Sequence, residues 1–354
     1  MDEIYVLGLG CISSIGNSAE EVWEAITNTD FNSNANKENP HDFKSNLDRS
    51  LRRRADRDSL LGSYVVNEAC KDSRINLDDV DRKRIGTIFS SGHDSVDTNL
   101  EFADQVSDKD ASLCSPQTFS NTVTNAALGY ICMETGFKGV STMFSACNSI
   151  PFTINLLDED KADIIFAGYL EGYSKELFES IKEYGCLGYD QVTEAAVSIL
   201  LSRRSFPTKT GYCSVKGYSE INLGIDPIIF RGEKEEDIGN RISRCIQNVV
   251  SAYGKDIGVV FSSGGNKDFN RIENHAIKEV LPNARLIENV KEIFGEIMGA
   301  SLHVNLMLGA LCLKKGFIPN TLLLEGELTE FKNILVNGYD DLGNYISVLI
   351  SKVD

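Results

Sequence analysis

Cys147 is the best-placed candidate nucleophile in this chain of 354 residues. It lies in the segment SACNS at residues 145–149, between an apolar run and the apolar segment 150–154. This pattern predicts a thiol at the end of a buried strand that opens a helix, where helix amides lower a thiol pKa. A thiolate nucleophile usually works with a histidine. None of the four histidines lies where that partner is expected: His41, His93, His275 and His303.

The composition argues against several classes of function. The net charge of −17 disfavours nucleic acid and anionic membranes as partners. No apolar run approaches the roughly 20 residues of a membrane span, and the acidic start at residues 1–3 lacks the basic region of a signal peptide. The nine cysteines include no Cys-x-x-Cys pair, which favours a reducing cytoplasm over a disulfide frame or a zinc site. We therefore expect a cytoplasmic protein.

An internal repeat organises the chain. The segment IGTIFSSG at residues 85–92 recurs as IGVVFSSG at 257–264, displaced by about half the chain. Each copy reads as a short buried strand that ends in a turn of small residues and follows a helix-like stretch. The repeat favours a duplicated chain, with an N-terminal half at 1–205 and a C-terminal half at 206–354.

Further strands and helices alternate along the chain, which argues for α/β layers. The predicted strands are residues 4–8, 162–168, 195–201 and 345–350. The predicted helices include 19–27, 63–71, 238–253 and 298–313, and residues 232–237 read as a solvated turn and helix start.

Five segments together resemble the elongating β-ketoacyl synthases, which have the thiolase-like fold. The segments are VLGLGCISSIGN at 6–17, SNTVTNAA at 120–127, SACNS at 145–149, NVKEIFGE at 289–296 and GFIPNT at 316–321. Each match is weak alone, but their order and spacing are specific. The resemblance implies an α/β protein with a duplicated five-layer αβαβα arrangement. It also implies dimerisation through strands beside the nucleophile, an acyl carrier protein as partner, and neither a metal nor an organic cofactor.

In that family the cysteine attacks an acyl thioester, and two histidines assist decarboxylation of a malonyl unit and stabilise the resulting oxyanions. By resemblance the nucleophile is Cys147, the first histidine falls on Ser262 or Ser263, and the second falls on Glu296. The lysine of the second motif is retained as Lys291. A serine cannot become cationic, and an ionised glutamate would oppose a developing enolate. The candidate catalytic residues are therefore Cys147, Lys291 and Glu296, without the imidazole pair.

The resemblance also covers a C-terminal gate, which is altered here. The segment NGYDDLG at 337–343 replaces a glycine-rich motif. The family's gating phenylalanine, which carries an oxyanion amide, falls on Asp341, and its flanking glycines fall on Asp340 and Leu342. Glycines allow unusual backbone angles and close approach of a substrate. We expect the acidic loop to be stiffer and unfavourable to an apolar acyl chain.

A basic segment, LRRRADR at 51–57, stands out in this acidic chain. Arg53 and Arg54 fall where the family docks its acidic carrier protein. The alternative interpretation is a solvated helix start whose arginines form local ion pairs.

Other candidate residues have structural alternatives. Cys147 either accepts an acyl group or is a buried small residue inherited from an active ancestor. Lys291 either assists catalysis or pairs with Glu296. Ser262 and Ser263 read as turn residues, as do Ser90 and Ser91 in the other copy of the repeat. His303 follows Glu296 by two helical turns, where a rescue role is conceivable. His275 reads as a helix-surface residue, and His41 and His93 as loop or turn residues.

These observations lead to three functional hypotheses. The first is a non-condensing partner of an active ketosynthase, resembling the chain-length factors of type II polyketide systems, in a heterodimer. Chain-length factors commonly replace the cysteine, so the retained Cys147 counts against it. The second is an acyltransferase, homodimeric or not, in which Cys147 accepts an acyl group without decarboxylation. The third is a condensing enzyme with displaced histidines.

Overall fold

The structure is a computed structural model, and it describes residues 3–28, 43–108, 111–183, 192–203, 211–323 and 330–353. His41 lies outside the described residues. The predicted boundary between residues 205 and 206 also lies outside them and stays a prediction.

The described strands form one sheet of ten strands in the order β3-β2-β4-β5-β1-β6-β10-β9-β7-β8. The strands of the first half are β1 (Ile4–Ile12), β2 (Ile85–Ser91), β3 (Ser141–Ser145), β4 (Ile164–Glu171) and β5 (Ala195–Ser202). Those of the second half are β6 (Cys213–Asn222), β7 (Val259–Phe261), β8 (Arg285–Ile287), β9 (Asn333–Tyr339) and β10 (Asn344–Ser351). The two half-sheets are joined only by a short antiparallel pairing of β1 with β6.

The two half-sheets have the same pairing pattern, strand for strand. In the first half, β2 pairs in parallel with β3 and β4, and β5 pairs antiparallel with β4 and β1. In the second half, β7 pairs in parallel with β8 and β9, and β10 pairs antiparallel with β9 and β6. The two copies of the sequence repeat contain β2 and β7, which hold equivalent positions. The predicted duplication is thus confirmed in the fold.

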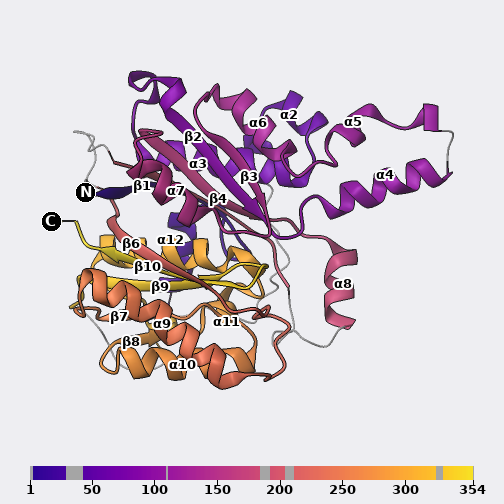
Figure 1. Cartoon of the computed structure of the whole chain (residues 1–354). Coiled ribbons are helices and arrows are strands. Elements are labelled where there is room, and N and C mark those ends of the chain that lie inside the picture. The colour runs from indigo at the N-terminus through magenta and orange to yellow at the C-terminus, as the bar shows by residue number, and fades with distance from the viewer. Residues whose placement is uncertain are drawn as a thin grey trace.

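Helices and half-sheets stack in five layers, as predicted (Figure 1). The outer helices of the first half are α3 (Arg57–Ser73) and α6 (Ala126–Thr135), and those of the second are α9 (Glu235–Tyr253) and α10 (Lys267–Val280). Between the half-sheets lie α7 (Ser149–Asp158) and α12 (Ser301–Lys315). Three separate apolar clusters fill the spaces between the layers. Since α12 contacts sheet on both sides, it is apolar all round and buried from residue 301 to residue 313.

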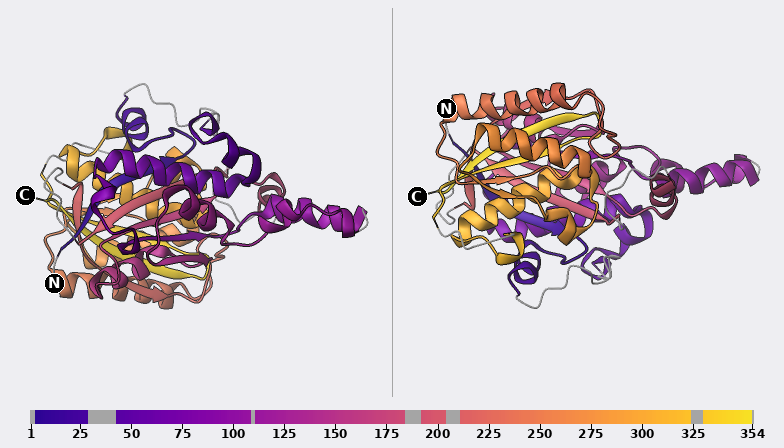
Figure 2. Two further views of the ribbon diagram at one scale, coloured as in Figure 1. Left: turned by 90° about the horizontal axis from the view of Figure 1, so that it is seen from above. Right: turned by 90° about the horizontal axis from the view of Figure 1, so that it is seen from below.

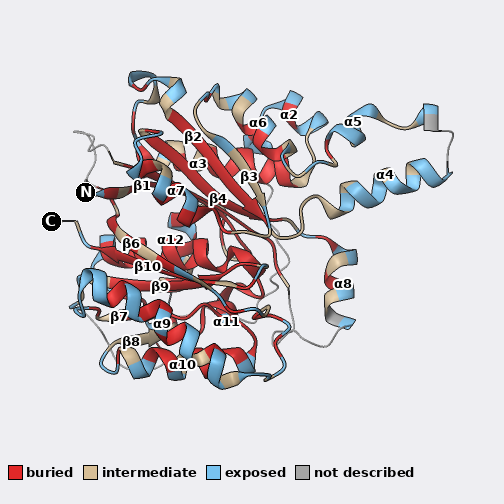
Figure 3. Cartoon of the chain, viewed as in Figure 1, coloured by how far each residue is buried: buried red, intermediate tan, exposed pale blue. Residues whose placement is uncertain are grey.

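Burial follows these layers, with the half-sheets and α12 buried and the outer helix faces exposed (Figure 3). The remaining helices are α1 (Ala19–Thr27), α2 (Arg49–Arg54), α4 (Val96–Asp108), α5 (Pro116–Ser120), α8 (Lys175–Glu183) and α11 (Val290–Phe294). Short 3-10 turns are η1 (Lys44–Asn46), η2 (Leu77–Asp79), η3 (Arg82–Arg84), η4 (Ala111–Leu113), η5 (Met298–Ala300) and η6 (Asn320–Leu322). No helix in the described part of the chain is both long and apolar enough to cross a bilayer.

The helices α4 and α5 form an arm that projects from the layered body (Figure 2). None of the residues of α4 is buried. A helix without a buried face gains little from packing within its own chain. The arm therefore lacks the packing that stabilises the other long helices.

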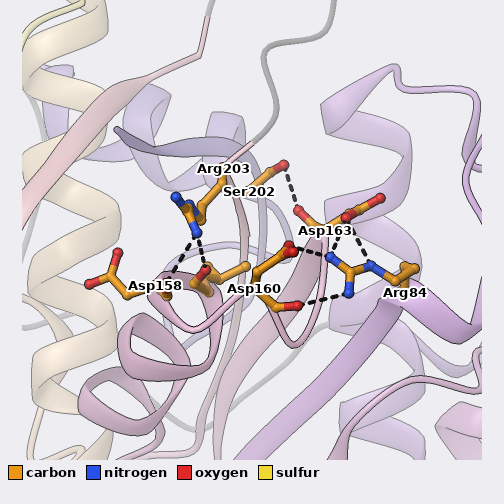
Figure 4. A network of polar contacts seen from close by, with 7 residues as sticks. Arg84, Asp158, Asp160, Asp163, Ser202 and Arg203 are labelled. Atoms are coloured by element: carbon orange, nitrogen blue, oxygen red, sulfur yellow. Dashed lines mark hydrogen bonds and ion pairs between the residues drawn. The ribbon is translucent and has the colours of Figure 1, made fainter. Parts of the chain in front are cut away.

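A polar network ties α7 to the sheet at the end opposite Cys147 (Figure 4). Arg84, just before β2, donates to the Asp163 carboxylate at 2.8 and 3.0 Å and to the Asp160 carbonyl at 2.8 Å. Ser202, at the end of β5, donates to the Asp163 carbonyl at 2.8 Å, and Arg203 donates to the Asp158 carbonyl at 3.1 Å. These contacts fix the C-terminal end of α7, and hence the direction in which the helix presents its N-terminus.

All four of the strands predicted from apolar runs are present, and the predicted helices lie within α1, α3, α9 and α12 with η5. The predicted environment of the candidate nucleophile was wrong in one respect. The strand before Cys147, β3, is an edge strand that pairs only with β2, and its five residues are half-buried or exposed. Its Phe144 packs edge-on against Phe152 of α7 rather than inside a core.

Candidate functional site

Cys147 lies in a strained turn between β3 and α7. The preceding residue, Ala146, has φ of 66°, a left-handed conformation that costs a residue with a Cβ about 1–2 kcal/mol. The turn is held from two sides. The Ala146 amide donates to the Ser91 carbonyl at 2.8 Å, and the Ala146 carbonyl accepts from the Asp341 amide at 3.1 Å. The turn thus fixes the half-buried thiol at the entrance of α7.

The thiol of Cys147 is not activated by its surroundings. Burial is the main cause that raises its pKa above the ordinary thiol value, and the negative charges of Asp340 and Glu220 raise it further. The expectation that helix amides lower this pKa was therefore wrong, because burial of the thiol, and then the negative charges of Asp340 and Glu220, act in the opposite direction. Among the described residues, no imidazole forms a hydrogen bond with the sulfur.

Asp340 begins the gate loop, residues 340–343, which connects β9 to β10. Its buried carboxylate accepts from the Asn148 amide at 3.2 Å, and also from the amides of Leu342 and Asn344 and the Asn344 side chain at 2.9–3.1 Å. Asn148 caps α7 by accepting from the Ile150 amide. Burial raises the pKa of Asp340. The Asp340 carboxylate therefore accepts the hydrogen bond of the Asn148 amide at the start of α7. An anionic intermediate would otherwise be stabilised by that amide.

The carboxylate of Asp341 lies against Tyr169 of β4. This carboxylate accepts from the Tyr169 hydroxyl at 2.7 Å. It also lies close to Gly92 and Gly299, where an added Cβ would collide with it or with Tyr169. Burial is the main cause that raises the pKa of Asp341 to about 7, and the negative charge of Glu171 is the second. The acidic loop is thus fixed on both sides by hydrogen bonds, as its composition predicts.

Lys291 and Glu296 form a fully buried ion pair, the contact that the sequence offered as the alternative to a catalytic role for Lys291. Lys291 Nζ donates to Glu296 Oε1 at 2.5 Å and to the Tyr339 hydroxyl at 2.6 Å. Glu296 Oε1 also accepts from the Met298 amide at 2.8 Å. Because a buried charge needs this degree of pairing, the Glu296 carboxylate is committed to Lys291 and the backbone.

Ser262 and Ser263 face the outer helix layer through Glu273 of α10. Ser262 Oγ donates to Glu273 at 2.7 Å, the Ser263 amide donates to it at 2.8 Å, and so does the Tyr345 hydroxyl at 2.7 Å. Glu273 is completely buried, and burial raises its pKa. These two serines are positioned by a structural network and do not contact Glu296.

The described histidines are placed differently from one another. His303 is fully buried in α12, and its Nε2 hydrogen-bonds to Ser149 Oγ at 2.9 Å rather than to Glu296. Burial lowers the pKa of His303 to about 3, so the ring is neutral. His93 follows β2 and contacts Glu171 at 2.9 Å. His275 lies exposed on α10, as predicted. The rescue role considered for His303 is thus not supported by any contact with Glu296.

Arg53 and Arg54 are exposed on α2, and neither forms an ion pair with any described residue. Arg54 contacts only Ser50 through its guanidinium, and the Arg54 carbonyl anchors Asn121 and Tyr130. Their charges are therefore free to face solvent. No group of three or more metal-ligating side chains among the described residues could hold a metal ion.

Comparisons with known proteins show similarity to β-ketoacyl synthases. The family model "Beta-ketoacyl synthase, N-terminal domain" matches residues 29–168. The 3-oxoacyl-[acyl-carrier-protein] synthase 2 of Staphylococcus aureus (strain N315) is 22% identical over 90% of this chain and 87% of that protein. The chain is thus similar to β-ketoacyl synthases over most of its length.

Solved structures confirm the ketosynthase fold over the whole chain. The ishigamide ketosynthase/chain length factor aligns with a TM-score of 0.82 and 16% identity, over 100% of both chains. The complex AntDE:AntF, a type II PKS acyl-carrier protein with its ketosynthase bound to the hexaketide, aligns with a TM-score of 0.81 and 15% identity, also over 100% of both chains. At these low sequence identities, the similarity shows the fold alone.

The site contains several carboxylates that sequence reasoning missed. Burial raises the pKa of Glu273 and of Asp226. The charge of Glu171 contributes to the raised pKa of Asp341. The repeat offered one usable signal. His93 directly follows the turn of the first copy, at the carboxyl end of a parallel strand, where polar site residues gather.

Proposed function

We propose that this chain is a non-condensing β-ketoacyl synthase homologue. It completes a dimer with an active ketosynthase that elongates acyl chains on an acyl carrier protein, in fatty acid or polyketide synthesis. The observation that carries the proposal is the commitment of the Ser262 and Glu296 side chains, and of the Ser263 backbone amide, to buried structural contacts. By resemblance these residues occupy the positions of the two catalytic histidines.

The electrostatics of the site support this proposal. A malonyl thioester and the enolate formed from it are both anionic. Here they would meet the carboxylates of Asp340 and Glu220, whose charges already raise the pKa of Cys147. Removing one donor to a developing oxyanion elsewhere costs about 3–4 kcal/mol. Two absent imidazoles therefore remove most of the stabilisation that decarboxylation needs.

The amides near Cys147 support it as well. The Asp341 amide, which by resemblance would donate to a thioester oxyanion, donates to Ala146 instead. The Asn148 amide donates to Asp340. An acyl oxygen would have to displace both contacts, and one of them is charge-assisted.

The proposed partners follow from two surfaces. The free edge of β3 lies beside Cys147, and in this family dimers form through that region. Phe152 of α7 is 39% exposed next to it, which suits a covered interface. Arg53 and Arg54 are the proposed docking residues for the acidic carrier protein, because their charges have no partner among the described residues.

Co-expression tests the lead proposal. The chain is produced together with each ketosynthase encoded near its gene, with an affinity tag on this chain only. We expect a stable complex with one of these enzymes. A stable homodimer that ignores every one of them, and that forms a condensation product alone, would contradict the proposal.

A second function is favoured by the retained thiol. Cys147 is half-buried at a strained turn, a geometry that an acyl-accepting nucleophile would use. In this alternative Cys147 accepts an acyl group from a carrier thioester and passes it on without decarboxylation. Peptide mass spectrometry after incubation with acyl carrier thioesters separates the two functions. A Cys147 adduct supports the transferase, and its absence at long times removes it.

A further inference from the structure

An acid–base cluster of two buried and two half-buried residues lies beside the gate loop. We call His93, Tyr169, Glu171 and Asp341 the gate cluster. His93 Nδ1 donates to Glu171 Oε1 at 2.9 Å, and Tyr169 donates to Asp341 Oδ2 at 2.7 Å. Tyr169 is completely buried and Glu171 nearly so. The cluster thus joins the end of β2, the end of β4 and the gate loop.

Two carboxylates of the gate cluster meet at Gly92. A Cβ on Gly92 would lie less than 3.0 Å from both Asp341 Oδ2 and Glu171 Oε2, so the two oxygens face the same small space beside Gly92. Glu171 Oε2 is buried and has no hydrogen-bond partner among the described residues. Two carboxylates that face the same space favour the state in which one of them is protonated, because repulsion between like charges disfavours ionisation of both.

The charged groups around Asp341 come from several elements. His93 faces it from the end of β2, Glu171 from β4 and Asp226 from the loop after β6, while Asp340 precedes it on the gate loop. One imidazolium therefore stands against a group of carboxylates. The balance leaves the gate cluster negative unless a carboxyl is protonated.

We propose that the gate loop is closed while a proton is held by the neighbouring carboxylates of Asp341 and Glu171, so that loss of this proton sets two like charges against each other, releases the Asp341 amide from the Ala146 carbonyl and opens the loop. The closed loop brings Asp341 onto the Ala146 carbonyl and against Glu171. Deprotonation places two like charges side by side in a buried space, and movement of the loop is the way to separate them. This device is independent of whether the chain condenses acyl groups.

The titration of the cluster gives the direction of the effect. The pKa of Asp341 is about 7 in the closed loop, raised by burial and then by Glu171. An exposed aspartate has a pKa of about 3.9. Closure is therefore fully favoured below about pH 4 and weakens as the pH rises to about 7. Burial lowers the pKa of His93, but the contact with Glu171 outweighs it and raises the value to about 9, so loss of its charge weakens closure further at higher pH.

Hydrogen exchange of the gate loop tests the proposal on the full-length protein. The amides of Asp341 and Gly343 are hydrogen-bonded in the closed loop, to Ala146 and Asp340, and they exchange only when it opens. Their protection factors are measured by mass spectrometry from pH 5 to pH 8, after correction for the intrinsic pH dependence of exchange. We expect protection to fall by about tenfold or more between pH 5 and pH 7. Peptides from α9 should stay unchanged.

Two variants and one control complete the test. Asp341→Asn mimics the protonated carboxyl, and we expect its loop to remain protected across the range. If that variant does not fold, Glu171→Gln removes the opposing charge and should flatten the profile in the same way. Glu273→Gln is the matched control, because Glu273 is also a buried carboxylate bound to a tyrosine, and it should keep the wild-type profile. Protection that is independent of pH in the wild type, or that falls equally in the folded variant, would overturn the proposal.

Discussion

The Asp341 amide donates to the Ala146 carbonyl at 3.1 Å, which fixes the gate loop against the residue that precedes Cys147. The next residue back, Asp340, binds the Asn148 amide on the other side of the thiol. The two neighbouring aspartates thus close the turn around Cys147 from the gate loop. These hydrogen bonds hold the closed gate loop against the turn, and the following predictions depend on this arrangement.

Alkylation of Cys147 should show a thiol that ionises late. Its rate with iodoacetamide, followed by peptide mass spectrometry, is expected to keep rising past the ordinary thiol pKa of about 8.5, because burial and the charges of Asp340 and Glu220 oppose the thiolate. Asp340→Asn should shift the profile to lower pH, and Glu273→Gln should not. A wild-type midpoint well below 8.5 would mean that the helix amides dominate after all.

The buried ion pair predicts strong coupling between Lys291 and Glu296. Lys291→Met leaves the Glu296 charge buried without its partner, and we expect a loss of about 3–5 kcal/mol in the free energy of unfolding. The loss in the free energy of unfolding for the double variant Lys291→Met/Glu296→Gln should be smaller than the sum of the losses for the two single variants. Urea unfolding of the four proteins gives the coupling energy. Additive losses would contradict the pairing.

Charge reversal at the proposed docking site should weaken binding of an acyl carrier protein. Arg53→Glu/Arg54→Glu exchanges attraction for repulsion, and we expect the Kd to rise by about tenfold or more at low ionic strength, with a smaller effect at high salt. The control is Lys278→Glu, which reverses the charge of an exposed residue on α10. Equal binding by both variants, measured by calorimetry, would remove Arg53 and Arg54 from the docking site.

An acidic residue at the edge of β3 should block assembly. Phe152→Asp places a charge in the proposed interface but removes only a partly exposed ring that contacts Phe144. We expect normal thermal unfolding of the isolated chain and loss of the complex in light-scattering chromatography. Ile229→Asp, which changes a residue that is 51% exposed elsewhere, should leave the complex intact. Unchanged assembly of Phe152→Asp would place the interface on another surface.

Local sequence patterns predicted the layers well. The repeat at 85–92 and 257–264 marks β2 and β7 because buried parallel strands are written as short apolar runs. The helix α12 was predicted from its apolar run, and its burial between two half-sheets explains why that run is not amphipathic. The ion pair between Lys291 and Glu296 was also within reach, since the two residues are close in sequence.

The electrostatics of the site were not predictable in this way. Asp340 reaches Asn148 across 192 positions of sequence, and His93 reaches Glu171 across 78. Contacts of that range leave no periodic pattern, so only the fold brings the residues together. The direction of the Cys147 pKa shift was predicted wrongly for this reason. The helix start is visible locally, whereas burial of the thiol and the charges of Glu220 on β6 and Asp340 on the gate loop depend on the fold.

The most direct test of the account replaces Cys147 by alanine in the complex with its ketosynthase. The reconstituted complex is given acyl and malonyl carrier thioesters, and elongated product is measured by mass spectrometry. The account predicts the same product yield with Cys147→Ala as with the wild-type chain, and no product from either chain alone. Loss of product with Cys147→Ala in an intact complex, or condensation by the isolated wild-type chain, would contradict it.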